Sequence, residues 1–114
     1  MNTLSSRAEV IHMADRSPSP QVEDGYTKIA NELLDAMMVF SFSSRQYSVI
    51  LAVMRKTYGY NKKTDDIGLS QVVKITGIDK AHISRTIRDL AEMRVIIRSQ
   101  GKFGHNLSIN KHYS

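Results

Sequence analysis

The chain has 114 residues with 41% hydrophobic residues, no cysteine and a formal net charge of +5, a composition and length that suit one small domain with a single core. The absence of cysteine excludes a disulfide framework, a cysteine-based zinc site and a thiol nucleophile. No apolar run has membrane-spanning length and the N-terminus lacks the apolar core of a secretion signal, so we expect a soluble protein with no membrane partner.

The positive charge is concentrated in two segments. The segment 45–63 contains five Lys and Arg residues and no acidic residue, and the segment 81–114 contains six against two. Residues 1–24, by contrast, carry two basic and four acidic side chains. Clustered positive charge is typical of a protein that binds a polyanion such as nucleic acid.

Residues 1–24 show no sustained periodicity, and Ser17 to Pro20 has the composition of a linker. We predict a flexible N-terminal arm over 1–24 and a folded domain over 25–114. Docking of Val10, Ile11 and Met13 on a neighbouring chain is the alternative for the arm.

Two helices are expected next. The first spans Thr27 to Phe40, with one broad apolar stripe that consists of Ile29, Ala30, Leu33, Leu34, Met37 and Phe40. The second starts at Ser43, because Ser43 and Gln46 have the spacing of a capping box and Phe42 and Tyr47 that of a hydrophobic staple. It should end just before Gly59.

The second helix carries two apolar surfaces. Its main stripe consists of Tyr47, Ile50, Leu51, Met54 and Tyr58. Val49 and Val53 lie on another side, which indicates either a central position or a second contact surface. Arg55 and Lys56, in the last turn, suit either helix termination or phosphate contact.

A short strand is expected at Ile67 to Leu69, followed by a helix-turn-helix over 70–93. Ser70 is a good N-cap, Val72, Val73 and Ile75 supply the apolar face, and Gly77 ends this helix where a left-handed residue is needed. Asp79 then begins a second helix, Lys80 to Met93.

This second helix has the pattern of a recognition helix. Ile83, Ile87 and Leu90 recur on one side, while Ala81, Arg85 and Arg88 lie near the opposite direction. Arginines around a small residue suit a major groove, which is about 12 Å wide. The alternative is an ordinary helical hairpin with a solvated outer face.

The pattern changes to strands after Met93. Val95 to Ile97 and the alternation around Leu107 and Ile109 predict a β-hairpin, whose loop holds Lys102, Phe103 and His105 between or beside glycines. Such a hairpin directly after a recognition helix is a wing. The expected fold is therefore α+β, mainly α: a winged helix-turn-helix of three to four helices plus a β-hairpin wing.

Patterns of catalytic and metal sites are not found. There is no phosphate-binding glycine loop and no nucleophile elbow, and the four histidines are not at metal-ligand spacings. Asp65 and Asp66 are adjacent and point in different directions, which favours a loop that caps Ser70 and Gln71 over a metal site. We therefore expect no enzyme, no cofactor and no metal.

One set of residues is more specific than a fold. This set consists of Asp24, Gly25, Tyr26, Asn31, Leu33, Leu34, Arg45, Gln46, Arg55, Lys56, Thr57, Tyr58, Gly59, Asn61, Lys62, Asp65, Ile67, Ser70 and Gln71. At these positions the chain resembles the N-terminal domain of the replication protein O family of lambdoid bacteriophages. The resemblance implies an origin-binding replication initiator. It also implies helicase-loading machinery as a partner, contacted through a further region that we expect to lie outside these residues.

We therefore expect sequence-specific binding of double-stranded DNA at the repeats of a phage replication origin, in the cytoplasm of the bacterial host. The candidate reading residues, taken from the helical wheel, are Lys80, Ala81, His82, Ser84, Arg85 and Arg88. Backbone contacts are expected from Lys62, Lys63, Ser70 and Gln71, and wing contacts from Lys102, Phe103 and His105.

A homodimer on DNA is expected, because one helix reads few base pairs and because Val49 and Val53 suggest an extra apolar surface. A winged-helix transcriptional repressor is an alternative function. A winged-helix module that binds only protein, without sequence-specific DNA binding, is another.

Overall fold

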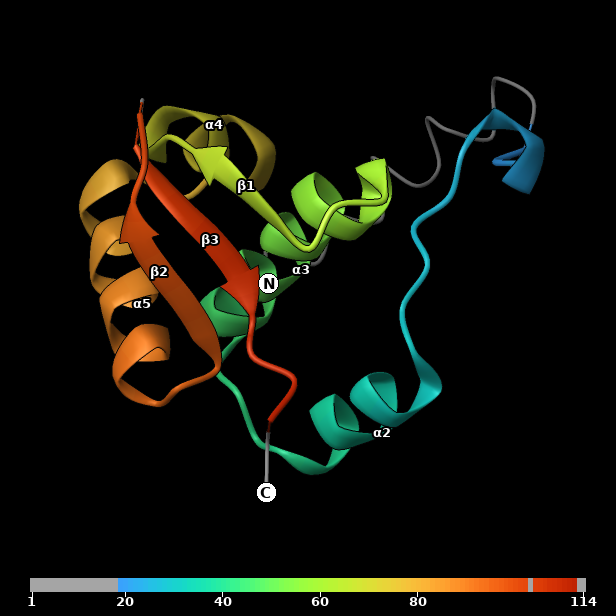
Figure 1. The fold of residues 1–114 in the computed structure, drawn as a ribbon, viewed down its shortest axis with the longest axis horizontal. Helices are drawn as coiled ribbons and strands as arrows, with labels where there is room; N and C mark the ends of the chain where they lie inside the picture. The colour runs from blue at the N-terminus through green and yellow to red at the C-terminus, as the bar shows by residue number, and fades with distance from the viewer. Residues whose placement is uncertain (1–18, 103, 113–114) are drawn as a thin grey trace, which may run out of the picture.

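The computed structural model describes residues 19–102 and 104–112, and within them the chain forms a winged helix-turn-helix (Figure 1). The 3-10 turn η1 (Val22–Asp24) precedes helices α2 (Asn31–Val39) and α3 (Ser44–Thr57), the 3-10 turn η2 (Tyr58–Tyr60) and strand β1 (Thr64–Ile67). Helices α4 (Leu69–Thr76) and α5 (Lys80–Glu92) and strands β2 (Ile96–Gln100) and β3 (His105–Ile109) follow. The expected fold class is confirmed.

The strands form one antiparallel sheet in the order β1-β3-β2. In Figure 1 the sheet lies in front of α3, with α5 along one edge and α4 at the end where the hairpin turns. Ile67 and Gln100 both pair with His105, so the end of β1, the end of β2 and the start of β3 meet at the wing. The sheet therefore joins the wing to the start of α4.

The core surrounds α3. Its side chains Val49, Ile50, Val53 and Met54 are at most 1% exposed, because α3 packs against α4, α5 and the sheet. Of the two alternatives for Val49 and Val53, the central position of the helix is confirmed and the extra contact surface is wrong, since both side chains are 0% exposed inside the domain. Leu51, expected in the main stripe, points outward instead and is half exposed.

Three other element boundaries differ from the prediction. Helix α2 starts at Asn31 rather than Thr27 and buries only Leu33 and Met37. Strand β1 contains Asp65 and Asp66, so the loop predicted there is wrong, and β1 ends where the strand was expected to start. Helix α3 ends at Thr57, one residue before the expected end, so Gly59 does lie past the helix, within the 3-10 turn η2.

The start of α3 confirms the predicted capping box and staple. The Gln46 backbone N–H donates to Ser43 Oγ at 3.2 Å, and the Ser43 N–H donates to Gln46 Oε1 at 2.9 Å. The rings of Phe42 and Tyr47 meet edge to face with centroids 5.2 Å apart. The Tyr47 hydroxyl also donates to the Phe40 carbonyl at 2.7 Å, which ties α3 to the end of α2.

Ser43→Ala should lower the free energy of unfolding by about 1 kcal/mol, because the Gln46 N–H loses its side-chain acceptor at the helix start. Urea denaturation measures this loss. Ser41→Ala, in the same exposed connection before α3, is the matched control and should change stability by less than about 0.5 kcal/mol. Equal effects of the two substitutions would show that the cap contributes nothing.

Candidate nucleic-acid interface

Helices α4 and α5 are joined by the turn 77–79. Gly77 has φ +74°, and its N–H donates to the Val73 carbonyl at 2.8 Å. A left-handed residue at this place is what the sequence predicted, and glycine adopts it without a Cβ penalty. The predicted N-cap is wrong, however: Gly68 precedes the helix and Ser70 is its second residue. Ser70 and Gln71 are exposed in the first turn of α4.

Asp79 is the N-cap of α5, as predicted. Its Oδ1 accepts from the His82 N–H at 3.0 Å, and its Oδ2 lies 2.5 Å from His82 Nδ1. The hydrogen bond from the His82 backbone, followed by that from the His82 ring, lowers the pKa of the Asp79 carboxyl below its ordinary value of 3.8. The same contacts hold the His82 ring against the helix start and leave Nε2 as the ring nitrogen that Asp79 does not engage.

The stability from this cap should depend on pH. Because the pKa of Asp79 is lower in the folded state, its contribution is fully present above the unfolded value and is lost as pH falls through the folded value. Asp79→Ala should therefore destabilise the protein at neutral pH, and this effect, measured by urea titrations, should shrink as the pH falls below the unfolded value. Asp79→Asn keeps a neutral acceptor, so its loss should be smaller than that of Asp79→Ala, but it should shrink over the same pH range because the charge is absent in both variants. A pH-independent loss for Asp79→Ala would contradict this account.

The outer face of α5 presents the predicted reading residues together. Lys80, Ala81, Ser84, Arg85 and Arg88 are all exposed, and His82 is half-buried. The opposite face is fixed in the core through its three apolar side chains, which are 0–3% exposed: Ile83, Ile87 and Leu90. A rigid helix thus carries a basic face with a small residue in its first turn.

The wing is the tip of the β2–β3 hairpin, where the Gly101 N–H donates to the Gly104 carbonyl at 3.0 Å. Lys102 is exposed at the tip, and His105 is the first residue of β3 rather than a loop residue. Phe103 lies outside the described residues. A Cβ at Gly104 would lie 2.8 Å from the Ile67 carbonyl and 3.0 Å from Gly68 Cα. This close approach holds the wing against the start of α4.

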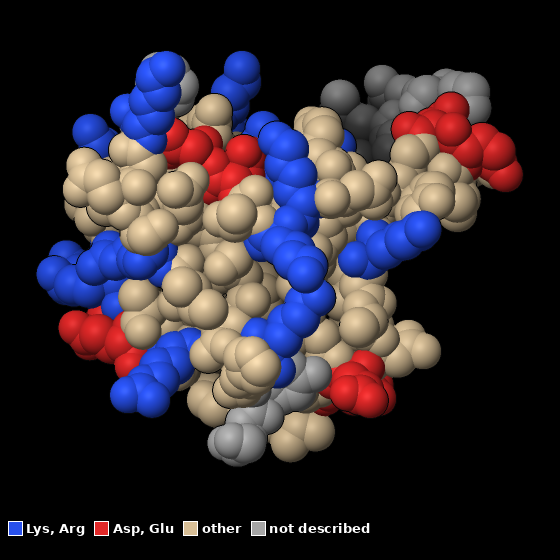
Figure 2. Space-filling view, viewed as in Figure 1, with Lys and Arg blue, Asp and Glu red and all other residues tan. Residues whose placement is uncertain are grey.

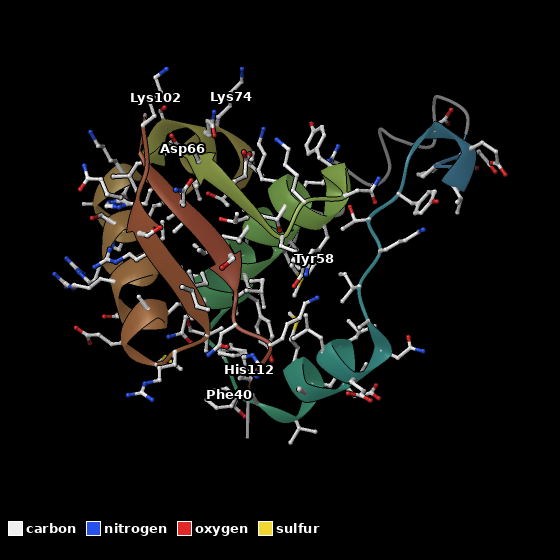
Figure 3. All side chains as sticks on the ribbon, in the orientation of Figure 1. Phe40, Tyr58, Asp66, Lys74, Lys102 and His112 are labelled. Carbon is white, nitrogen blue, oxygen red and sulfur yellow. The ribbon has the colours of Figure 1, made fainter. Side chains whose placement is uncertain are left out.

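One basic residue near the wing was missed by the sequence reasoning. Lys74 is exposed in the last turn of α4. Figure 3 shows Lys74 and Lys102 extending from the same end of the molecule, one from α4 and the other from the hairpin tip. No local sequence signal joins them, because their proximity depends on the packing of the hairpin beside α4.

The predicted backbone contacts fall in two places. Ser70 and Gln71 lie at the wing end of β1, whereas Lys62 and Lys63 precede its other end. Thr64 pairs with Ser108 and Ile67 with His105, so the two ends are about 10 Å apart along the strand. Lys62 Nζ also lies 3.5 Å from Asp65 Oδ1. The structure therefore does not bring these four residues together.

Comparison with known proteins gives the family. Residues 19–112 match the family described as Bacteriophage replication protein O. The chain belongs to this family. Within the replication protein O family, it is 38% identical over 91 residues to DNA replication protein gp18 of Salmonella phage P22, which covers 80% of this chain and 34% of the relative. It is 37% identical over 90 residues to Replication protein O of Escherichia phage lambda, which covers 79% of this chain and 27% of the relative.

The chain spans about a third or less of the length of these curated relatives. Among solved structures, it is similar to Bordetella bronchiseptica BpsR, studied for the regulation of its DNA binding by 6-hydroxynicotinic acid. That similarity has a TM-score of 0.48 and 17% identity and covers 83% of this chain and 69% of the other.

The replication protein O family match starts at residue 19, earlier than the residue 24 at which the predicted resemblance begins, and so includes η1. Residues 1–18 of the predicted N-terminal arm lie outside the described residues. Among the residues that are described, no three His, Asp or Glu side chains are placed to hold a metal ion, and no helix is long and apolar enough to cross a membrane.

Proposed function

We propose that this chain binds double-stranded DNA sequence-specifically at the repeats of a phage replication origin, as the DNA-binding domain of a replication initiator. The observation that carries the proposal is the exposed basic face of α5, whose opposite face is buried in the core. The chain that carries this helix belongs to a phage replication family. The place of action is the cytoplasm of the bacterial host, and the chemistry needs no catalytic residue and no cofactor.

Helix α5 enters the major groove with the face that carries Ala81, Arg85 and Arg88. Arg85 is the best candidate for a bidentate contact to guanine O6 and N7. Ala81 permits close approach of the helix and can contact a thymine methyl group. Further base or phosphate contacts come from the remaining polar side chains of this face, which are Lys80, His82 and Ser84.

Contacts to the DNA backbone position the reading helix. Ser70 and Gln71 at the start of α4 and Lys102 at the hairpin tip are exposed at the wing end of the sheet, where they can hold phosphates on either side of the groove. His105 and Phe103 complete the proposed wing contacts. Lys62 and Lys63 are proposed as backbone contacts at the other end of β1.

A homodimer on DNA remains part of the proposal, because one reading helix covers few base pairs. Val49 and Val53 cannot supply its interface, since both are fully buried. Half-sites of such a dimer would lie about 34 Å apart or a multiple of it. Native mass spectrometry of the protein with a single repeat measures the stoichiometry, and one chain per repeat would exclude the dimer.

Selection of bound duplexes from a random pool distinguishes the rival functions. The proposed initiator should enrich one motif that recurs in the replication origin of the encoding phage. A transcriptional repressor on the same fold would enrich a motif found at promoters. A module that binds only protein would enrich no motif.

A further inference from the structure

A second group of cations surrounds the turn η2 and is not used by α5 or the wing. The Arg55 guanidinium carbon lies 5.3 Å from the centroid of the Tyr60 ring, and Lys56 Nζ lies 5.9 Å from the same centroid. On the other ring of this turn, Lys111 Nζ lies 5.1 Å from the Tyr58 centroid. The turn thus brings basic residues of α3 and of the segment after β3 around two aromatic rings.

This group is separate from the reading face. It adjoins the start of β1, where Thr64 pairs with Ser108. The wing lies at the opposite end of β1, where Ile67 pairs with His105. Figure 2 shows a column of Lys and Arg atoms down the middle of the visible face, where β1 begins and β3 ends in Figure 1. Uncharged atoms separate this column from the basic groups over α5 at the left edge.

The backbone of the turn is shaped to present these side chains. A Cβ at Gly59 would lie 2.7 Å from Arg55 Nη1, so glycine leaves the space in which the guanidinium crosses the turn. Asn61 then adopts φ +57° and redirects the chain, and Lys62 and Lys63, which follow it and precede β1, are exposed. Tyr60 itself remains 55% exposed.

An exposed ring with adjacent cations suits unpaired DNA better than a duplex. In a duplex the base faces are stacked on each other, so a side-chain ring has none to cover. A single strand offers both a free base face for stacking and phosphates for the cations. A cleft of about 210 Å³ lies beside the Tyr58 ring, and its charged lining residues are Lys28, Lys111 and Glu32.

We propose that η2 and its flanking residues form a second nucleic-acid surface that binds unpaired DNA. Tyr60 stacks on a base, while Arg55 and Lys56 neutralise phosphates. Since α5 lies elsewhere, this surface can hold a single strand while α5 holds a duplex, and the inference does not depend on the sequence preference of α5.

The test measures fluorescence anisotropy of labelled oligothymidine and of a labelled random duplex with the full chain. Tyr60→Ala should weaken oligothymidine binding about fivefold or more, since one base–aromatic stack is lost, while Tyr60→Phe, which keeps the ring, should bind like wild type. Lys56→Ala should reduce the slope of log affinity against log salt by about 0.7 for the single strand. Lys74→Ala removes an equal charge from α4 and should leave oligothymidine binding unchanged, as should Arg85→Ala. Circular dichroism verifies that each variant is folded.

Three results would overturn the inference. Wild-type protein could fail to bind oligothymidine, or Tyr60→Ala could bind it as tightly as Tyr60→Phe. Equal weakening of the random duplex and of oligothymidine by Lys56→Ala would assign the surface to duplex backbone instead. Failure of the selection experiment on duplexes, by contrast, would remove the proposed reading function and leave this result standing.

Discussion

Replacing Leu90 by alanine is expected to lower the free energy of unfolding by about 2–5 kcal/mol. Leu90 is 0% exposed on the inner face of α5, which packs against α3, α4 and β2. The smaller side chain loses apolar burial and leaves a cavity that the surrounding helices and sheet fill only in part. Since small domains have about 5–15 kcal/mol of stability in total, this loss is a large fraction.

Urea denaturation with linear extrapolation measures the Leu90→Ala effect. Arg88→Ala, two residues earlier on the exposed face of the same helix, is the matched control and should stay within about 0.5 kcal/mol of wild type. Ile83→Val removes only one methylene from a neighbouring buried position and should cost about 0.5–1.5 kcal/mol, which stays measurable if Leu90→Ala does not fold. A loss below about 0.5 kcal/mol for Leu90→Ala would contradict tight packing of the inner face of α5 in the core.

Replacing Arg85 by alanine is expected to weaken binding to the cognate repeat by about 1–3 kcal/mol. Binding to random duplexes should weaken less, because the lost hydrogen bonds distinguish bases. The ratio of cognate to random affinity should therefore fall. Anisotropy titrations on both duplexes, at several salt concentrations, give the ratio and the salt slope together.

Arg85→Lys is the matched control for charge. Lysine keeps the positive charge but cannot make the planar bidentate contact, so the salt slope should be retained while the specificity ratio falls. Arg85→Ala should lose both, with the slope reduced by about one unit. An unchanged specificity ratio in both variants would show that α5 is not the reading element.

The elements that the sequence predicts correctly are those with local signals. The spacing of Ser43 and Gln46, the left-handed Gly77 and the cap at Asp79 each act within one turn of the chain. The position of Val49 and Val53 is different. Periodicity shows that α3 is apolar on more than one side. Only the structure shows that α4, α5 and the sheet of the same chain cover the side with Val49 and Val53, so that no partner chain is needed there.

The residues of the candidate site also fall into two groups, those predictable from local sequence and those whose position depends on the packing of distant segments. The outer face of α5 follows from helical spacing alone, so its residues were predictable. Strand β1 includes Asp65 and Asp66, and its pairing with β3 depends on backbone hydrogen bonds that leave no apolar alternation to read. The separation of Lys62 and Lys63 from the wing follows from that register.

The central claim is that α5 reads repeated origin sites. The most direct test is to footprint the wild-type chain and Arg85→Ala across the replication region of the encoding phage. We predict protection of several copies of one sequence by wild type, and loss of that protection by Arg85→Ala at protein concentrations where both still bind random duplex. The absence of protected repeats, or an identical footprint for the two proteins, would contradict the claim.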